Sequence, residues 1–274
     1  MRIVILAPSL YSETACAMVA HLAHSGYVPA GAIALPTLDS NTLRRKLGQW
    51  GAGRVFGYAR GKLLARENAK ASVANPYLTS FLRYESGSFR SLHEVGQHYD
   101  FPIAIRRDQN DDRSIALLSE WSPDLIVFTG GNILRQPVLD VPRLGVLNVH
   151  LGFLPEVRGM SAPEWSLLKN VPLGITIHYM DAGIDTGPVL KRFELPNAQG
   201  YTSLVDLHNR LVAFGVEKIA EVVRALAFGL ISAKQQSQVD RDNQFFVMHE
   251  LLQHRAAACL AQNLPPVIPE ATRG

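Results

Sequence analysis

Asn148 and His150 end an apolar run and stand two residues apart, a spacing that points both side chains to one face of a β-strand. Asp185 follows later in the chain, in a loop flanked by Gly183 and Gly187. An amide N–H can stabilise a developing oxyanion, an imidazole can move a proton, and a carboxylate can orient the imidazole and stabilise its cation. These three residue types together predict acyl transfer to an amine.

The stretch 145–190 resembles the folate-dependent formyltransferase family, which includes glycinamide ribonucleotide formyltransferase, the catalytic half of methionyl-tRNA formyltransferase and the sugar N-formyltransferases. The family pattern is Asn-x-His, then Leu-Pro, then Arg-Gly, and later Asp-Thr-Gly or Asp-Gly-Gly. This chain has these elements in the same order, as Asn148 and His150, Leu154-Pro155, Arg158-Gly159 and Asp185-Thr186-Gly187. The resemblance covers roughly residues 1–35 and 96–230.

The resemblance implies a role for each of the three residues. Asn148 is expected to donate to the formyl oxygen, His150 to transfer the proton, and Asp185 to orient His150. The donor is expected to be 10-formyltetrahydrofolate, and the acceptor the primary amine of a small metabolite. Transfer is expected to be direct, which agrees with the lack of a Ser, Cys or Lys placed as a nucleophile. No metal is expected.

The loop that carries Asp185 holds a second acid, Asp181, which competes for the same role. We choose Asp185 because it directly precedes Thr186 and Gly187, as the family pattern requires. Asp181 then either faces the folate or is simply a turn residue. We interpret His178, on the preceding strand, as structural support rather than as a catalytic residue.

The resemblance also implies where the folate binds. The segment after Gly130 matches the family segment that lines the pterin pocket, and ligands in open α/β sheets lie beyond the carboxyl ends of the strands. Val138 or Leu139 could add apolar contacts. The residues expected to contact the donor are Gly131, Asn132, Ile133, Leu134, Met180, Asp181 and Gly183.

The elements that position these residues predict an α/β fold. Its sheet is expected to be open, mostly parallel and twisted, with helices on both faces, a helical insertion and a helical C-terminal extension. Strands are predicted at 3–7, 28–35, 102–105, 124–129, 146–150, 173–180 and 189–195. Helices are predicted at 13–25, 114–121, 162–169, 204–228 and 246–260.

We expect one catalytic domain at 1–230, with an insertion at 36–95, and a short extension at 231–274 packed on the same domain. Within the insertion, the segment 42–70 is basic. It is interpreted either as a solvated helical surface or homodimer contact, or as a lid for an anionic acceptor such as a nucleotide sugar. A run of charge does not decide between these alternatives.

The composition is that of an ordinary globular protein, with 47% hydrophobic and 19% charged residues among 274. A formal net charge of +3 is too small to argue for nucleic acid as a partner. No stretch approaches the length of a membrane span, so a cytoplasmic protein is expected. Cys16 and Cys259, the two cysteines, are expected to be reduced and structural.

Two departures from the family pattern bear on the acceptor and on a loop. The first strand is followed by Ala-Pro-Ser-Leu at 7–10 instead of the usual glycine-rich turn, which counts against a glycinamide ribonucleotide acceptor. The family's His-Pro-Ser-Leu-Leu-Pro is His-Leu-Gly-Phe-Leu-Pro at 150–155, so the Ser is missing.

Three alternative functions are weighed. A formyltetrahydrofolate hydrolase (deformylase) uses similar residues with water, but members carry an N-terminal regulatory domain that is not expected ahead of Ile3. Formylation of methionyl-tRNA needs a C-terminal barrel domain, which is not expected after Phe228. The third alternative is a non-catalytic binding module that kept the fold, which the complete set of Asn148, His150 and Asp185 disfavours. Within formyl transfer, specific formylation of an amino-sugar nucleotide is a narrower alternative.

Overall fold

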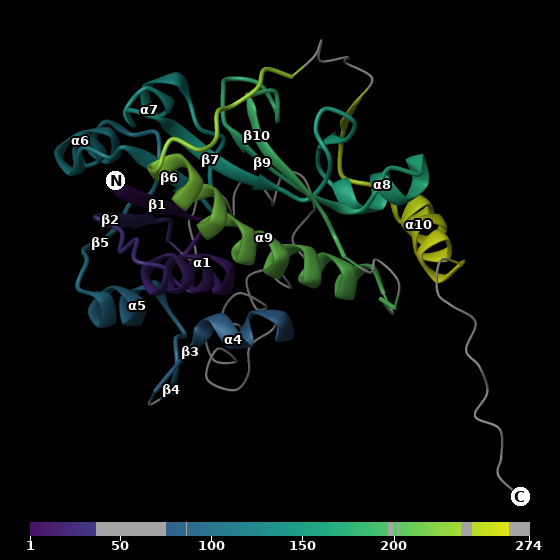
Figure 1. Cartoon of the computed structure of the whole chain (residues 1–274), viewed down its shortest axis with the longest axis horizontal. Coiled ribbons are helices and arrows are strands. Elements are labelled where there is room, and N and C mark those ends of the chain that lie inside the picture. Colours follow the sequence, from purple (N-terminus) through teal and green to yellow (C-terminus); the bar gives the residue numbers. More distant parts are fainter. Residues whose placement is uncertain (37–74, 86, 197–199, 202, 237–242, 263–274) are drawn as a thin grey trace, which may run out of the picture.

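Seven strands form one sheet that crosses the middle of the protein (Figure 1). The computed structural model describes residues 1–36, 75–85, 87–196, 200–201, 203–236 and 243–262. The strands of this sheet are β1 (Ile3–Ala7), β2 (Gly31–Ala34), β5 (Ile103–Ile105), β6 (Leu125–Phe128), β7 (Gly145–His150), β9 (Gly174–Tyr179) and β10 (Val189–Glu194).

The order across the sheet is β10–β9–β7–β6–β1–β2–β5. The five strands from β7 to β5 are parallel to one another, β9 is antiparallel to β7, and β10 is antiparallel to β9. The predicted open, mostly parallel sheet is therefore confirmed. Its antiparallel edge places the loop between β9 and β10 beside β7.

Helices cover both faces of the sheet (Figure 1). The helices α1 (Glu13–His24), α5 (Leu92–Tyr99) and α9 (Leu204–Ala227) contribute buried side chains to one core. The helices α6 (Asp112–Trp121) and α7 (Gln136–Leu139) contribute to a second core on the other face. A sheet buried on both faces in this way needs near-continuous runs of apolar residues along its central strands.

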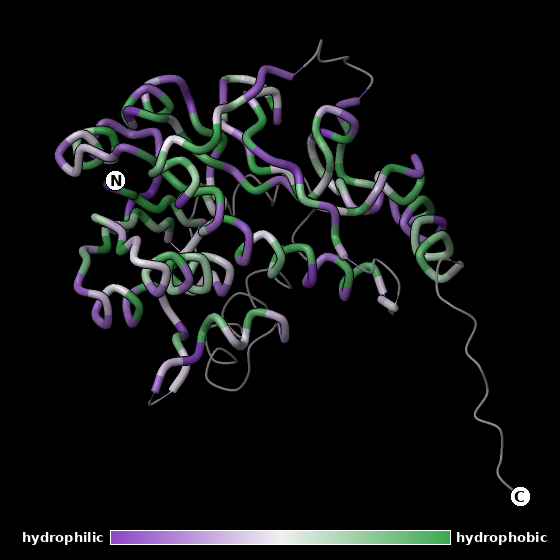
Figure 2. The backbone as a smooth tube through the Cα atoms, viewed as in Figure 1, coloured by the Kyte–Doolittle hydropathy of each residue, from purple (hydrophilic) through white to green (hydrophobic). Residues whose placement is uncertain are grey.

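The strand β1 shows how the sequence supplies both cores. Ile3 and Ile5 enter the core on the α1 side, while Val4 and Leu6 enter the other core, because successive side chains alternate between faces. Figure 2 shows hydrophobic stretches along the central strands and alternating hydrophobic and hydrophilic stretches along α9. This alternation is typical of a helix packed on a sheet by one side.

The described part of the segment before α5 packs on α1. It contains η1 (Pro76–Leu78), α4 (Thr79–Leu82) and a small hairpin, β3 (Arg83–Tyr84) and β4 (Gly87–Ser88). Leu78 and Leu82 are buried in the same core as α1. The predicted basic segment 42–70 lies outside the described residues.

A short parallel pair joins the C-terminal extension to the loop after β7. The strand β11 (Gln244–Phe245) pairs with β8 (Arg158–Gly159), and α10 (Glu250–Gln262) packs on α8 (Ala162–Lys169) (Figure 1). The helix predicted at 246–260 therefore begins later than expected. Phe245 stacks on Trp165 at 4.7 Å between ring centroids, and a two-residue strand held by such a contact leaves no periodic signal in the sequence.

The predicted strand 28–35 is also shorter in the structure. It begins at Gly31, because Pro29 has no N–H to donate to a ladder and Val28 is exposed.

The helix α1 ends at His24, one residue earlier than predicted. Burial of Cys16 within this helix raises the pKa of its thiol. No described helix is long and apolar enough to cross a membrane.

Candidate active site

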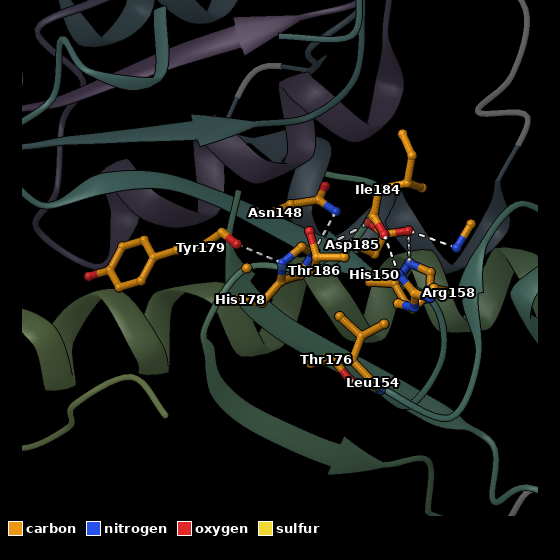
Figure 3. A network of polar contacts seen from close by, with 12 residues as sticks. Asn148, His150, Leu154, Arg158, Thr176, His178, Tyr179, Ile184, Asp185 and Thr186 are labelled. Carbon is orange, nitrogen blue, oxygen red and sulfur yellow. Dashed lines mark hydrogen bonds and ion pairs between the residues drawn. The ribbon is translucent and has the colours of Figure 1, made fainter. Parts of the chain in front are cut away.

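Asn148 and His150 lie on one face of β7 (Figure 3). Val149 between them packs against the core on the α9 side, so alternation turns its two neighbours to the opposite face. Across the ladder, Asn148 is opposite His178, and His150 is opposite Thr176 on β9. The prediction from the two-residue spacing, that Asn148 and His150 share one face of a strand, is therefore confirmed.

Asp185 reaches His150 from the loop between β9 and β10. Its Oδ2 lies 3.4 Å from Nδ1 of His150 and accepts a hydrogen bond from the N–H of Gly159 at 2.8 Å. The side chain of His150 is 6% exposed and that of Asp185 is 16% exposed, so the pair is largely shielded from water. The structure thus brings the three predicted catalytic residues into one site.

The other nitrogen of His150 is held by the backbone. Nε2 lies 2.7 Å from the carbonyl oxygen of Val157, and a carbonyl oxygen can only accept, so Nε2 carries a hydrogen. Nδ1 is therefore the nitrogen that can gain or lose a proton, and it faces the carboxylate of Asp185. A proton on Nδ1 makes an imidazolium that the carboxylate stabilises.

His178 contacts Asn148 directly. Nδ1 of His178 lies 2.8 Å from the carbonyl oxygen of Tyr179 and so carries the hydrogen, which leaves Nε2 to accept from Nδ2 of Asn148 at 3.1 Å. Burial lowers the pKa of His178 to about 4, and the attraction of the Asp185 carboxylate only partly opposes this effect. At neutral pH the ring is therefore uncharged, and its 3.6 Å approach to Oδ1 of Asp185 is not an ion pair.

This neutral ring fixes the orientation of the Asn148 amide. One N–H of the amide is donated to His178, so the amide nitrogen and not the amide oxygen faces the ring. The second N–H has no partner among the described residues, so it is available for a ligand. We interpreted His178 from the sequence as structural support. In the structure it contacts Asn148, one of the three predicted catalytic residues.

The stability of the protein should depend on His178 at mildly acidic pH. The pKa of this group is about 4 in the folded protein, and about 6.5 in an unfolded chain. Between these values the unfolded state binds more protons, so the free energy of unfolding should fall by about 3 kcal/mol as the pH drops through this window.

His178→Asn should remove this part of the pH dependence. Urea unfolding at about pH 7 and about pH 4.5 measures the effect, with the exposed His93→Asn as a matched control. The control should retain the wild-type difference between the two pH values. The same pH dependence in all three proteins would contradict the assignment of a neutral, buried His178.

Asp181 is engaged in its own turn. Its Oδ1 accepts from the N–H of Gly183 at 3.0 Å and from the hydroxyl of Thr186 at 2.5 Å. This arrangement holds the start of the loop, and the carboxylate near His150 is that of Asp185 instead. The choice of Asp185 over Asp181 therefore agrees with the geometry.

The loop after β6 holds four of the predicted donor contacts. Gly131 and Asn132 lie beside the fully buried Gln109. Oε1 of Gln109 accepts from the backbone N–H of Asn132, and the backbone N–H of Gln109 donates to Oδ1 of Asn132. The side chain of Ile133 is 75% exposed, and that of Leu134 is buried. The loop is thus held by Gln109 at Gly130 and Asn132, while Gly131 and Ile133 are exposed.

Gln109 was not singled out from the sequence. Its Nε2 donates to the carbonyl oxygens of Ala7 and Gly130, so one amide ties the end of β1 to the loop after β6. A Cβ at Gly131 would lie 2.2 Å from Oε1 of Gln109, and the φ angle of this glycine is +142°. Gln109 stands in a polar stretch with no periodic pattern, so no local signal could have distinguished it.

Thr176 hydrogen-bonds the loop in which the family's Ser is missing. Its hydroxyl donates to the carbonyl oxygen of Gly152 at 2.7 Å and accepts from the N–H of Leu154 at 3.1 Å. The residue is fully buried and lies opposite His150 in the ladder. The loop that follows His150 is therefore anchored from the neighbouring strand.

Comparison with known proteins identifies the family. The formyl transferase family model matches residues 79–223, more than half of the chain. The chain therefore belongs to the formyl transferase family, as the sequence pattern predicted. The match includes residues 79–95, which we assigned to an insertion, so the limits of that insertion stay a prediction.

A curated relative and two solved structures are similar to this chain. The methionyl-tRNA formyltransferase of Pelobacter propionicus is 32% identical over 148 residues, which are 53% of this chain and 46% of that protein. The chain spans about half the length of the curated relatives it matches.

The two structures share the fold. The phosphoribosylglycinamide formyltransferase of Anaplasma phagocytophilum is 16% identical with a TM-score of 0.54, over 90% of this chain and 98% of that one. A sugar N-formyltransferase from a Shewanella species is 14% identical with a TM-score of 0.53, over 95% of this chain and 87% of that one.

Proposed function

We propose that this protein transfers a formyl group from 10-formyltetrahydrofolate to the primary amine of a small metabolite. The observation that carries the proposal is the meeting of Asn148, His150 and Asp185 on one face of the sheet, with an N–H of Asn148 left available. In this proposal the catalytic domain spans 1–230, and 231–274 is an extension packed on it.

The three residues divide the work of the reaction. The amine nitrogen attacks the formyl carbon, a C–N bond forms, and the formyl oxygen gains negative charge. The available N–H of Asn148 donates to that oxygen, which stabilises the tetrahedral intermediate. The bond from the formyl carbon to N10 of the folate then breaks, and the proton lost by the amine ends on N10.

His150 moves this proton at Nδ1, and the carboxylate of Asp185 stabilises the imidazolium while it exists. The hydrogen bond from Nε2 to Val157 keeps the ring from turning away. Direct transfer is supported by the hydroxyls close to the site. Thr176 donates to Gly152 and Thr186 donates to Asp181, so neither is set up as a nucleophile.

The residues present fit the proposed donor. Leu134 and Met180, from the loops after β6 and β9, belong to one apolar cluster that includes Phe128 and Val146 on the same face as Asn148. Of these four, Phe128 and Met180 are only half-buried, so a flat pterin ring can pack on them. The N–H of Asn132 and the carbonyl oxygen of Ile133 already bind Gln109 and Asn110, and the other backbone groups of residues 131–133 can meet the edge of the ring. Asp181 and Gly183 would border the same pocket.

The start of α1 supports an acceptor that is not a glycinamide ribonucleotide. Ser12 caps the helix through a hydrogen bond from the N–H of Ala15, and Glu13 places a carboxylate in the first turn. Oε2 of Glu13 also accepts from the N–H of Asn75. A negative charge at this helix start opposes the binding of a phosphate there.

Methionyl-tRNA is a second candidate acceptor, because the Pelobacter propionicus relative is a methionyl-tRNA formyltransferase. The formal charge of +3 for the whole chain gives no support to a tRNA partner. The two acceptors need the same chemistry at Asn148, His150 and Asp185. Only a direct assay separates them.

The test is release of tetrahydrofolate across a panel of acceptors, with a reaction that lacks any amine as the control. The panel contains amino-sugar nucleotides, hydroxylated ornithine derivatives and methionyl-tRNA. Release that depends on a small amine supports the proposal. If tetrahydrofolate is released only with methionyl-tRNA, the protein is still a formyltransferase but its acceptor is the tRNA. If the same amount is released with and without an amine, the protein is a hydrolase.

A further inference from the structure

The segment that follows α9 returns to the catalytic loop. The backbone groups of Lys234 and Val189 exchange two hydrogen bonds, each of 2.8 Å, which lay residues 231–236 along the start of β10. Two residues further on, Nε2 of Gln236 donates to the carbonyl oxygen of Asp185 at 2.9 Å and to that of Gly187 at 2.7 Å. This residue lies beyond the matched family segment, which ends at 223.

The backbone of Asp185 is in an unfavourable conformation. Its φ angle is +53°, in the left-handed region, which Asp enters more readily than most residues with a Cβ but still adopts seldom. A relaxation of this angle would swing the carboxylate away from Nδ1 of His150. Such a conformation persists only where the surroundings hold it, and the contacts of Gln236 fall on the carbonyls of this residue and of Gly187.

We propose that Gln236 is a positioning residue that holds the Asp185 loop in the conformation that presents the carboxylate to His150. This inference rests on the role of Asp185 in the proposed function. The C-terminal extension lies outside the matched family segment, and this proposal gives it a part in the site.

The partner atoms require an amide at this position. Two carbonyl oxygens must be satisfied at once, which the NH₂ group of Gln can do and a carboxylate cannot. The other end of the amide, Oε1, is buried without a hydrogen-bond partner among the residues that the structure describes. Both hydrogen bonds that Nε2 makes go to the catalytic loop. An apolar replacement leaves these two carbonyl oxygens without this donor, which should lower the stability of the protein.

A second contact that fixes Asp185, a hydrogen bond from the N–H of Gly159, also depends on the C-terminal extension. The N–H of Gly159 binds the carboxylate, and Gly159 is paired with Phe245 of β11. A Cβ at Gly159 would lie 2.2 Å from the carbonyl oxygen of Phe245, and its φ angle is +88°. Gln236 thus fixes the backbone of Asp185, while Gly159 fixes the end of its side chain.

The test compares Gln236→Met and Gln236→Glu with Gln235→Ala, the exposed neighbour, as the matched control. Met keeps the length of the side chain and removes the donor, and Glu keeps the shape and replaces the donor with an acceptor. The kcat per folded protein and the KM values for donor and acceptor are measured, together with the pH titration of the His150 ring by NMR. His178, Arg158 and Asp181 also face Asp185 or its loop, so the titration is assigned with a His150→Gln variant.

Both Gln236 variants should lower kcat by up to about 10²-fold with an unchanged donor KM, because the carboxylate is misplaced and the folate pocket is not. The titration midpoint of His150 should shift in both variants and stay at the wild-type value in Gln235→Ala. An unmoved His150 titration in the folded Gln236 variants would overturn the inference, whatever the change in kcat. If the wild-type protein shows no formyl transfer, the proposed function fails, and the titration still tests the role of Gln236.

Discussion

Replacement of His150 by alanine should lower kcat by about 10²–10⁴-fold, the usual contribution of a positioned proton-transfer group. Nδ1 of His150 is the nitrogen that faces Asp185, and Nε2 is fixed by Val157. Loss of the ring removes both the proton carrier and the cation that the carboxylate stabilises. Steady-state kinetics with the accepted amine measures the effect.

The fold should survive this replacement, because the hydrogen bonds of Thr176 still anchor the loop after His150. Thermal unfolding checks this point, and the exposed His93→Ala serves as a control with wild-type kcat. Turnover close to wild type in a folded His150→Ala protein would remove His150 from the mechanism.

Replacement of Asn148 by alanine should lower kcat by about 10²–10³-fold, which is the cost of losing one donor to a developing oxyanion. The amide is pre-oriented by its hydrogen bond to the neutral ring of His178, so its second N–H needs no reorganisation as the charge develops. Most of the loss should appear in kcat and little in the KM of the donor, because the contact strengthens in the transition state.

Asn148→Asp tests the same contact with nearly the same shape. A carboxylate offers no N–H to the oxyanion and adds a negative charge beside it, so this variant should be at least as slow as Asn148→Ala. It also places two acceptors face to face at Nε2 of His178. A kcat for Asn148→Asp near that of the wild type would show that the amide is not the oxyanion donor.

The sequence predicts the parts of the site that depend on local spacing. The two-residue separation of Asn148 and His150 specifies a shared strand face, and the runs at 3–7 and 124–129 specify buried parallel strands. The family pattern then selects Asp185 over Asp181. These features need no knowledge of which side chains meet across the fold.

Other parts of the site depend on contacts between distant segments. The amide of Gln109 meets a loop that lies 23 residues away, and the amide of Gln236 meets carbonyls 51 and 49 residues away. The protonation of His178 depends on its burial against β7. A polar residue in an aperiodic stretch carries no sign of such a partner, which is why neither glutamine could be predicted.

The central claim is direct formyl transfer at Asn148, His150 and Asp185, and a single-turnover reaction with an isotopically labelled formyl group on 10-formyltetrahydrofolate tests it most directly. We expect the label to pass from the donor to the nitrogen of the amine, with no labelled protein at any time point and no transfer by His150→Ala. Label that appears on the protein, or that is released as formate whether or not an amine is present, would contradict it.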